Sequence, residues 1–456
     1  MATPLVIQQF VPVASVEFAY HGQHTTFVNT DDDLVQWTTQ RTTSGQPGQW
    51  TVTLVDRLIH GHSWAQEIPP GAYVEIRADN TASATLPIRM RGFVTGSQYG
   101  WTIGQTGGPT RTIQIMGEDY TWLYFSMQIM YLWQSLRRTA LKEAALSING
   151  VGLHANWGVP TGLMTPREFI DSINQHVLLS PTHGLLTGYR HYMTDVVPDP
   201  TWSVTIDNDH LFSMVNTTIQ SYQGPLWSLM AYYATPGLSE MFMFDAESGP
   251  IGTFRVAPFY NVDQPNTLAD LAVAPYLPTV GLDPAEVSSV QTGYSDQEVA
   301  NFFLVQPDAT GSLALKGVAS YLNPAPHGNP REDLISQAQY GMRPLLIQTP
   351  LLSLLTTGGV PKASELLRGQ ASQMATYLYQ TQHANQTLAS GTIQAHGRPY
   401  WMPGRYVEIP HIGKYYLQGV AETFQCVGAA SPSWMATLSV VRGQVSSLDV
   451  VPDLGG

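Results

Sequence analysis

The sequence predicts a β-rich α+β fold in which two related β-barrel domains flank a central α+β region. Both ends of the chain show short runs in which apolar and polar side chains alternate with a period of two. The stretch between them contains helical periodicity, and a heptapeptide near the front recurs near the end. The expected domains are residues 1–118, 119–285 and 286–456, the last with a helical insertion at about 330–385.

The first domain is expected to consist of strands. Period-two alternation, typical of half-buried strands, occurs at residues 16–20, 50–55 and 113–116. Gly and Pro clusters between these runs predict tight turns.

The central region changes to helical spacing. Tyr120 to Leu146 carries apolar residues three and four apart and contains no Gly or Pro, so a helical segment is expected there. A second helix should begin after Thr165, because Thr165 and Glu168 form a capping box and Pro166 fits the first turn. A third is expected at 226–233. Short strands should follow at 240–244 and 253–256.

The strand signal returns in the last domain. Residues 299–305 are predicted as a strand, and the tail from Gly391 to Val451 is again β. Within the insertion, the final helix is expected to begin at Pro361.

The repeated heptapeptide joins the two ends. Pro70–Ile76 and Pro403–Ile409 agree at six of seven positions, each with a Pro-Gly turn leading into a strand. Gly92 and Gly117 follow the first copy 25 residues apart. We align them with Gly419 and Gly443, which follow the second copy 24 residues apart.

This spacing favours two related barrel domains, and two unrelated β domains with the same turn chemistry are the alternative. Two similar barrels per chain in a three-fold assembly would form a ring with pseudo-six-fold symmetry.

The amino-acid composition favours some classes of function and argues against others. Charged residues make up only 12 % of the chain and hydrophobic ones 43 %. This balance suits either a large static assembly or a polar-surfaced β protein standing alone. The net charge of −13 argues against tight nucleic-acid binding. With Cys426 the only cysteine, no disulfide within the chain is expected, and neither a signal peptide nor a membrane anchor is predicted.

Two clusters invite a metal-site interpretation. His60 and His62, with Glu67 as a third ligand, could hold zinc, but loop histidines are the favoured interpretation. Asp31–Asp33 lacks the ligand spacing of a calcium loop and is interpreted as a solvated turn. No metal and no cofactor are expected.

Paired acids raise the possibility of a glycosidase. Glu118 and Asp119 would point to opposite faces of a strand, and Asp207 with Asp209 is simpler as a polar turn. The glycine-rich stretch 104–108 lacks the Lys of a phosphate-binding loop and is expected to be a hairpin loop. No catalytic residue is assigned.

Aromatic residues around the repeated turns are candidates for a subunit interface, where Trp and Tyr are enriched. The predicted interface residues are Tyr73, Glu75, Tyr400, Trp401, Arg405, Tyr406 and Glu408.

Three patterns recur in order along the chain. They are a strand-Gly-acid end of the front domain, a central Trp-helix-Pro-Glu-Phe pattern followed by Phe-Arg and Pro-Phe, and a back domain opening on Val-Ala-Asn. They lie at 115–119; at 227–230 with Pro236, Glu240, Phe242, 254–255 and 258–259; and at 299–301, 397–399, 403–407, 416–422 and 437–443. In these patterns the chain resembles the baseplate hub family of contractile phage tails, the late control protein D family.

The resemblance implies a non-enzymatic homotrimer with two tail-tube-like barrels per subunit. It would join the tail tube protein to the spike protein within the virion tail baseplate, beside the wedge proteins, after synthesis in the bacterial host cytoplasm. DNA would pass through its lumen without specific binding. Two alternatives stay open: a tail-associated cell-wall hydrolase, and a glycan-binding or receptor-binding tail protein.

Overall fold

The structure is a computed structural model of the whole chain. It describes residues 11–30, 33–57, 61–80, 85–103, 109–126, 128–129, 163–180, 185–204, 215–216, 224–231, 233–235, 237–256, 279–295, 299–307, 321–323, 328–349, 351–352, 360–382, 389–426 and 432–445.

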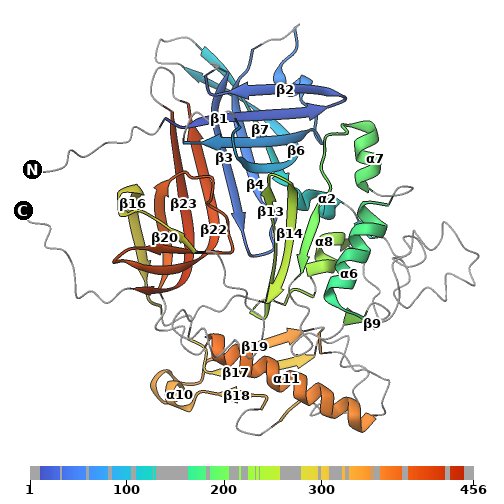
Figure 1. Ribbon diagram of the computed structural model, residues 1–456, viewed down its shortest axis with the longest axis vertical. Coiled ribbons are helices and arrows are strands. Elements are labelled where there is room, and N and C mark those ends of the chain that lie inside the picture. The colour runs from blue at the N-terminus through green and yellow to red at the C-terminus, as the bar shows by residue number, and fades with distance from the viewer. Residues whose placement is uncertain are drawn as a thin grey trace, which may run out of the picture.

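One large curled sheet dominates the molecule (Figure 1). Its front strands, which we call unit 1, are β1 (Val13–Tyr20), β2 (Gln23–Val28), β3 (Leu34–Thr42), β4 (Gln49–Val55), β5 (Tyr73–Asp79), β6 (Ile88–Ile103) and β7 (Pro109–Asp119). Its back strands, unit 2, are β15 (Thr279–Gly281), β16 (Val287–Gly293), β20 (Ala389–His396), β21 (Arg405–Ile409), β22 (Gly413–Gln425) and β23 (Ser433–Val445). Two short helices interrupt the units, α1 (Trp64–Glu67) and a 3-10 turn at Pro284–Glu286.

The strands form where period-two alternation predicts them. In β4, Trp50, Val52 and Leu54 are buried while the residues between them are partly exposed. The strands expected at 16–20, 50–55 and 113–116 lie in β1, β4 and β7. The β-rich α+β class is confirmed.

The two units are parts of a single sheet among the described residues. The main strand order is β16-β20-β23-β22-β3-β4-β7-β6-β5-β1-β2, and β21, which pairs with β22 and β15, lies off this path. The antiparallel ladder between β22 and β3, which we call the internal seam, joins unit 2 to unit 1.

A central layer of helices and a small sheet covers one side of the large sheet (Figure 1). Its helices are α2 (Thr121–Ser126), α6 (Pro166–Ile173), a π-helical turn (Asn174–Leu178), α7 (Leu185–Tyr192) and α8 (Leu226–Ala231). Its strands are β10 (Thr201–Val204), β13 (Ser239–Ala246) and β14 (Gly249–Val256), with the short pairs β8 (Gln128–Ile129) with β12 (Gly224–Pro225) and β9 (Leu163–Met164) with β11 (Val215–Asn216).

The helix predictions in this layer have mixed outcomes. The capping box of Thr165 and Glu168 is present, with Thr165 Oγ1 accepting from Glu168 N at 3.2 Å. The helix expected from Tyr120 is shorter than predicted, because α2 ends at Ser126 and β8 follows it. Residues 130–146 lie outside the described part of the chain.

A third group of elements lies between β16 and β20 in sequence and at the bottom of Figure 1. It contains β17 (Phe302–Pro307), β18 (Arg331–Glu332), α10 (Leu334–Tyr340), β19 (Pro344–Thr349) and α11 (Val360–Gln382). The stretch expected to be a helical insertion therefore contains β19 as well as two helices. Phe303 and Leu378 of this group are buried in one core with Trp227 of the central layer.

Candidate functional site

The internal seam is the place where the two units meet, and the aromatic side chains at its centre are fully buried. Phe424 of β22 lies opposite Trp37 of β3, and their rings stack with centroids 5.6 Å apart and planes at 15°. Trp434 of β23 packs edge-on against Trp37 at 6.2 Å. Phe424 and Trp434 thus belong to the core of unit 1 although unit 2 supplies them.

A buried ion pair reinforces this seam. Arg89 of β6 donates from Nε and Nη2 to Glu422 Oε2 at 3.2 and 2.9 Å, and both side chains are less than 5 % exposed. Thr39 Oγ1 donates to the same carboxylate oxygen at 3.3 Å. Arg89 Nη2 also donates to the main-chain oxygen of Trp401 at 2.8 Å. One guanidinium therefore holds the strand β22 and the turn before β21 against unit 1.

A second ion pair attaches unit 1 to the central layer. Arg41 of β3 pairs with Asp245 of β13, with the two side chains 8 % and 2 % exposed. Asp245 Oδ2 also accepts from the main-chain nitrogen of Arg91 at 2.9 Å. Deleting either partner of such a pair leaves a buried, uncompensated charge, so its loss should strongly destabilise the packing of β13 on the sheet.

A third pair attaches unit 2 to the same layer. Arg255 of β14 pairs with Glu240 of β13, and Tyr416 of β22 donates its hydroxyl to Glu240 Oε2 at 2.8 Å. Burial raises the pKa of Glu240, and Arg255 and Tyr416 oppose that rise by stabilising the charged form. The central layer is thereby fixed to both units by charge-assisted contacts.

Asp119 is the last residue of β7 and is buried near Arg41, the cation of the second ion pair. Its Oδ1 accepts from the main-chain nitrogen and hydroxyl of Thr121, the first residue of α2. Burial raises the pKa of Asp119 to about 6, and the nearby Arg41 guanidinium limits the rise. The carboxyl is 3 % exposed, so it organises the turn into α2 from inside the protein.

The repeated heptapeptides have the same local structure in the two units. Gly71 and Gly404 lie at φ +84° and +82°, a region that favours glycine. Gly71 N donates to Val94 O at 2.7 Å, and Gly404 N donates to Leu417 O at 2.8 Å. Val94 of β6 and Leu417 of β22 are therefore equivalent positions.

A shared β-bulge follows these positions. The β6–β7 register shifts between Val94 and Gly96, and the β22–β23 register shifts between Leu417 and Gly419. Gly96 is therefore the counterpart of Gly419. The sequence alignment, which matched Gly92 with Gly419, was wrong because it chose a glycine earlier in the same strand. A bulge kept at the same position in two units indicates duplication of the whole strand pattern.

A second shared bulge lies at the opposite side of each unit. The β3–β4 register shifts between Leu34 and Gln36, and the β16–β20 register shifts between Val287 and Ser289. The strand β16 thus has the place in unit 2 that β3 has in unit 1.

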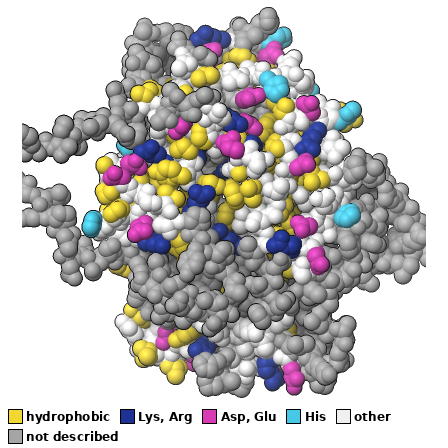
Figure 2. All heavy atoms as spheres, in the orientation of Figure 1, with side chains coloured by type: hydrophobic (Ala, Val, Ile, Leu, Met, Phe, Trp, Pro, Cys, Tyr) yellow, Lys and Arg dark blue, Asp and Glu magenta, His cyan; other side chains and the backbone are white. Residues whose placement is uncertain are grey.

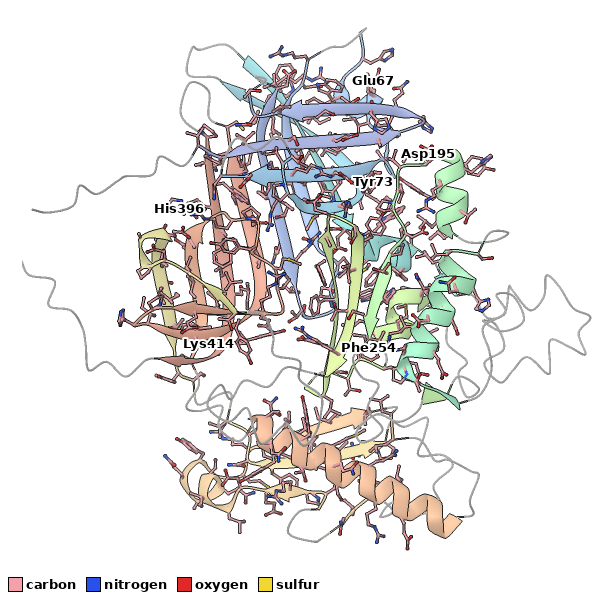
Figure 3. The ribbon with its side chains drawn as sticks, viewed as in Figure 1. Glu67, Tyr73, Asp195, Phe254, His396 and Lys414 are labelled. Atoms are coloured by element: carbon pink, nitrogen blue, oxygen red, sulfur yellow. The ribbon has the colours of Figure 1, made fainter. Side chains whose placement is uncertain are left out.

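Of the predicted interface residues in the first repeat, Tyr73 is buried and Glu75 is partly exposed. Tyr73, labelled in Figure 3, is 3 % exposed and packs against Phe93 and Tyr120 in the core shared with the central helices. Its hydroxyl donates to Glu75 Oε1 at 2.8 Å, and Arg91 Nε donates to the same oxygen at 3.0 Å. These contacts with Tyr73 and Arg91 help to hold the pKa of Glu75 below its usual value, although burial opposes them.

The predicted interface residues of the second repeat lie partly in the interior and partly at the surface. Trp401 is 1 % exposed and donates from Nε1 to His396 O at 2.9 Å. Tyr400, Arg405 and Tyr406 are partly exposed, and Glu408 is exposed. Tyr406 packs edge-on against the ring of Tyr416, and Lys414 (labelled in Figure 3) lies over its ring at 5.0 Å.

The candidate chemical sites are only partly within the described residues. His60, Asp31, Asp32, residues 104–108, Asp207 and Asp209 lie outside them, whereas His62 is exposed and Glu67 belongs to α1. Within the described part of the chain, no group of three or more His, Cys, Asp or Glu residues could hold a metal ion. Nor does that part contain a helix long and apolar enough to cross a membrane. On the face in Figure 2, acidic and basic side chains are interspersed.

No protein-family model matches the chain, and no curated protein matches it in sequence. Solved structures do. The chain is similar to a tail protein from Neisseria meningitidis MC58 (12 % identity, TM-score 0.43) and to the prophage MuSo2 43 kDa tail protein from Shewanella oneidensis (12 % identity, TM-score 0.46). Each of these matches covers 94 % of this chain and 96 % of the other. A third match, the Francisella PdpA-VgrG complex, covers 99 % of this chain and 55 % of the other, with 10 % identity and a TM-score of 0.39. The structural neighbours are thus tail and VgrG-complex proteins.

Proposed function

We propose that the chain is a non-enzymatic structural hub of a phage-type tail baseplate, which assembles as a homotrimer into a ring of six similar units. The observation that supports this most is the internal seam. In one chain, unit 2 already docks on unit 1 through a main-chain ladder, aromatic stacking and the buried pair of Arg89 and Glu422. A chain that joins its two halves in this way can join further copies in the same way.

The seam is a head-to-tail contact, because β22 of one unit meets β3 of the other and the two edges differ. Contacts of this kind generate closed rings when the rotation between units divides a full turn. Six units from three chains form a ring that matches a six-fold tube on one face and a three-fold spike on the other.

The remaining partners follow from this role. We assign the tail tube protein to one face of the ring, the spike to the other and wedge proteins to the rim, with the virion tail baseplate as the location. The net charge of −13 suits a lumen that DNA traverses without binding, since like charges repel. The partly or fully exposed members of the predicted interface set stay candidate contacts: Glu75, Tyr400, Arg405, Tyr406 and Glu408.

Electron microscopy of the purified chain tests this assembly. We expect end-on views with a central hole and six similar lobes that alternate in size with three-fold symmetry. Rings with another number of lobes, or twofold particles, would contradict the proposal. A peptidoglycan-release assay on the same sample should show no turnover, and measurable release would favour the hydrolase.

A further inference from the structure

We propose that the outer edge of β6, from Thr95 onward, pairs with β16 of the next copy in a defined antiparallel register that places Trp101 opposite Val290. The inference rests on the proposed function only in taking a second copy of this chain as the partner. We call this contact the external seam. It repeats, between chains, the internal seam that β22 and β3 form within one chain.

The first step is the equivalence of β6 and β22. Because Gly96 and Gly419 correspond, later residues of the two strands correspond in order, and Trp101 is the counterpart of Phe424. The pairing within each unit agrees, since Trp101 lies opposite Arg111 as Phe424 lies opposite Trp434.

The second step is the equivalence of β3 and β16. The ladders of each unit can be followed residue by residue from the bulge glycine to the outer strand. The two paths are Gly96–Met116–Thr51–Thr38 in unit 1 and Gly419–Ser439–Thr392–Gln291 in unit 2. Thr38 and Gln291 are equivalent, so their neighbours Trp37 and Val290 are equivalent too.

The third step transfers the register. In the internal seam Phe424 lies opposite Trp37. Replacing each residue by its counterpart places Trp101 opposite Val290 of another copy. The same transfer places Gln98 opposite Gly293, because Ala421 lies opposite Gln40.

Both edges of the external seam are open among the described residues. Within the part of the chain that the structure describes, β5 pairs with β6 as far as Phe93, and β16 ends the sheet with β20 as its strand neighbour. On β6, Tyr99 and Trp101 are 46 % and 69 % exposed. An unpaired edge that carries large exposed aromatics is a site for strand addition.

The core of unit 2 shows what the second copy would supply. Unit 1 is closed by Phe424, which is fully buried in its core. In unit 2, Val287 and Val290 of β16 lie at the margin of the core and are only partly buried. Trp101 of a second copy, the counterpart of Phe424, would cover these two valines. Burying their apolar surface and that of Trp101 favours association.

The space around the bulge glycines supports the same pairing. A Cβ on Gly419 would lie 3.3 Å from Arg41 O and from Thr42 Cγ2, across the internal seam. A Cβ on Gly96 would meet nothing within 4 Å. The two backbones are alike, and what Gly96 lacks is the strand that covers Gly419.

Disulfide trapping tests the register. In a Cys426→Ala background, Gln98→Cys and Gly293→Cys are combined in one chain. Gln98 and Gly293 are both exposed, and a Cβ on Gly293 would meet nothing within 4 Å. Residues directly opposite in an antiparallel pair have Cβ atoms about 4.5–5.5 Å apart, close to disulfide geometry. Mild oxidation should give covalent dimers and trimers.

The matched control is Gln98→Cys with Gln291→Cys, displaced by two residues on the same face, where diagonal neighbours lie about 7–8 Å apart. It should crosslink poorly. If the chain forms trimers but the first pair does not crosslink, or both pairs crosslink alike, the external seam is wrong and the trimer stands. A chain that stays monomeric and uncrosslinked overturns both proposals.

Discussion

Gly96 and Gly419 follow the same β-bulge in the two units, yet only Gly419 is covered by a neighbouring strand. The covering strand is β3, which begins the internal seam at Thr42 opposite Gly419. The difference between two otherwise equivalent glycines marks the edge at which we expect a second copy to dock.

Gly96→Val and Gly419→Val should therefore have opposite effects. Gly96→Val leaves the melting temperature of the dilute monomer unchanged and weakens self-association, because the side chain enters the external seam. Gly419→Val lowers monomer stability by about 1–3 kcal/mol, since it overpacks the internal seam. Thermal unfolding and sedimentation velocity of both variants check this. Loss of monomer stability in Gly96→Val would count against an open edge.

Trp101→Glu should abolish assembly without unfolding the chain. Trp101 is 69 % exposed, so the change costs the monomer little, but it would place a charge in the external seam. The control is Ile335→Glu on α10, at a side chain that is 85 % exposed. Native mass spectrometry should show oligomers for the control and monomers for Trp101→Glu. Equal oligomer populations would show that Trp101 lies outside the contact.

Arg89→Ala should destabilise the monomer strongly. It leaves Glu422 buried without its cation, a loss of about 3–5 kcal/mol. Arg57→Ala is the control, because Arg57 is 56 % exposed where it pairs with Asp33 and such pairs contribute at most about 1 kcal/mol. Urea unfolding should show a much lower midpoint for Arg89→Ala alone. Similar midpoints would mean that the buried pair does not hold the seam.

Asp119→Asn should change the pH dependence of stability. The folded-state pKa of Asp119 is about 6 against an ordinary value of 3.8, so the folded chain binds a proton that the unfolded chain has released. The free energy of unfolding therefore falls as pH rises from about 4 to 6, by roughly 3 kcal/mol from this group. Asn removes that fall.

Urea unfolding of wild type and Asp119→Asn at several pH values measures the difference. Asp171→Asn, at an exposed acid on α6, should keep the wild-type profile. If the pH profile of Asp119→Asn matches that of the wild type, ionisation of Asp119 does not change the free energy of unfolding, and the raised pKa is wrong.

The sequence predicted the repeat because its turn chemistry is local. A Pro-Gly turn at positive φ needs glycine, so Gly71 and Gly404 mark the same backbone conformation in both copies. The glycine alignment that followed was wrong because Tyr73 pairs with Phe93, twenty residues on, whereas Tyr406 pairs with Tyr416, ten residues on. The connection between the paired strands is longer in the first copy, and nothing in the sequence shows that extra length. The alignment could therefore not be corrected from the sequence.

The seams could not be predicted from the sequence for a different reason. The ladder that places Phe424 opposite Trp37 joins strands at opposite ends of the chain, and alternation shows that a strand exists, not its partner. Arg89 and Arg91 alternate with Ile88 and Met90, a pattern typical of a strand whose arginines face solvent. All four are buried, because the central layer and the turn before β21 cover that side.

The most direct test of the central claim is the solution mass of the purified chain, measured by light scattering across a range of concentrations. One chain has a mass of 50.0 kDa. The account predicts a discrete species at three times that mass, which Trp101→Glu converts to monomer. A single species of one chain mass at every concentration would contradict it.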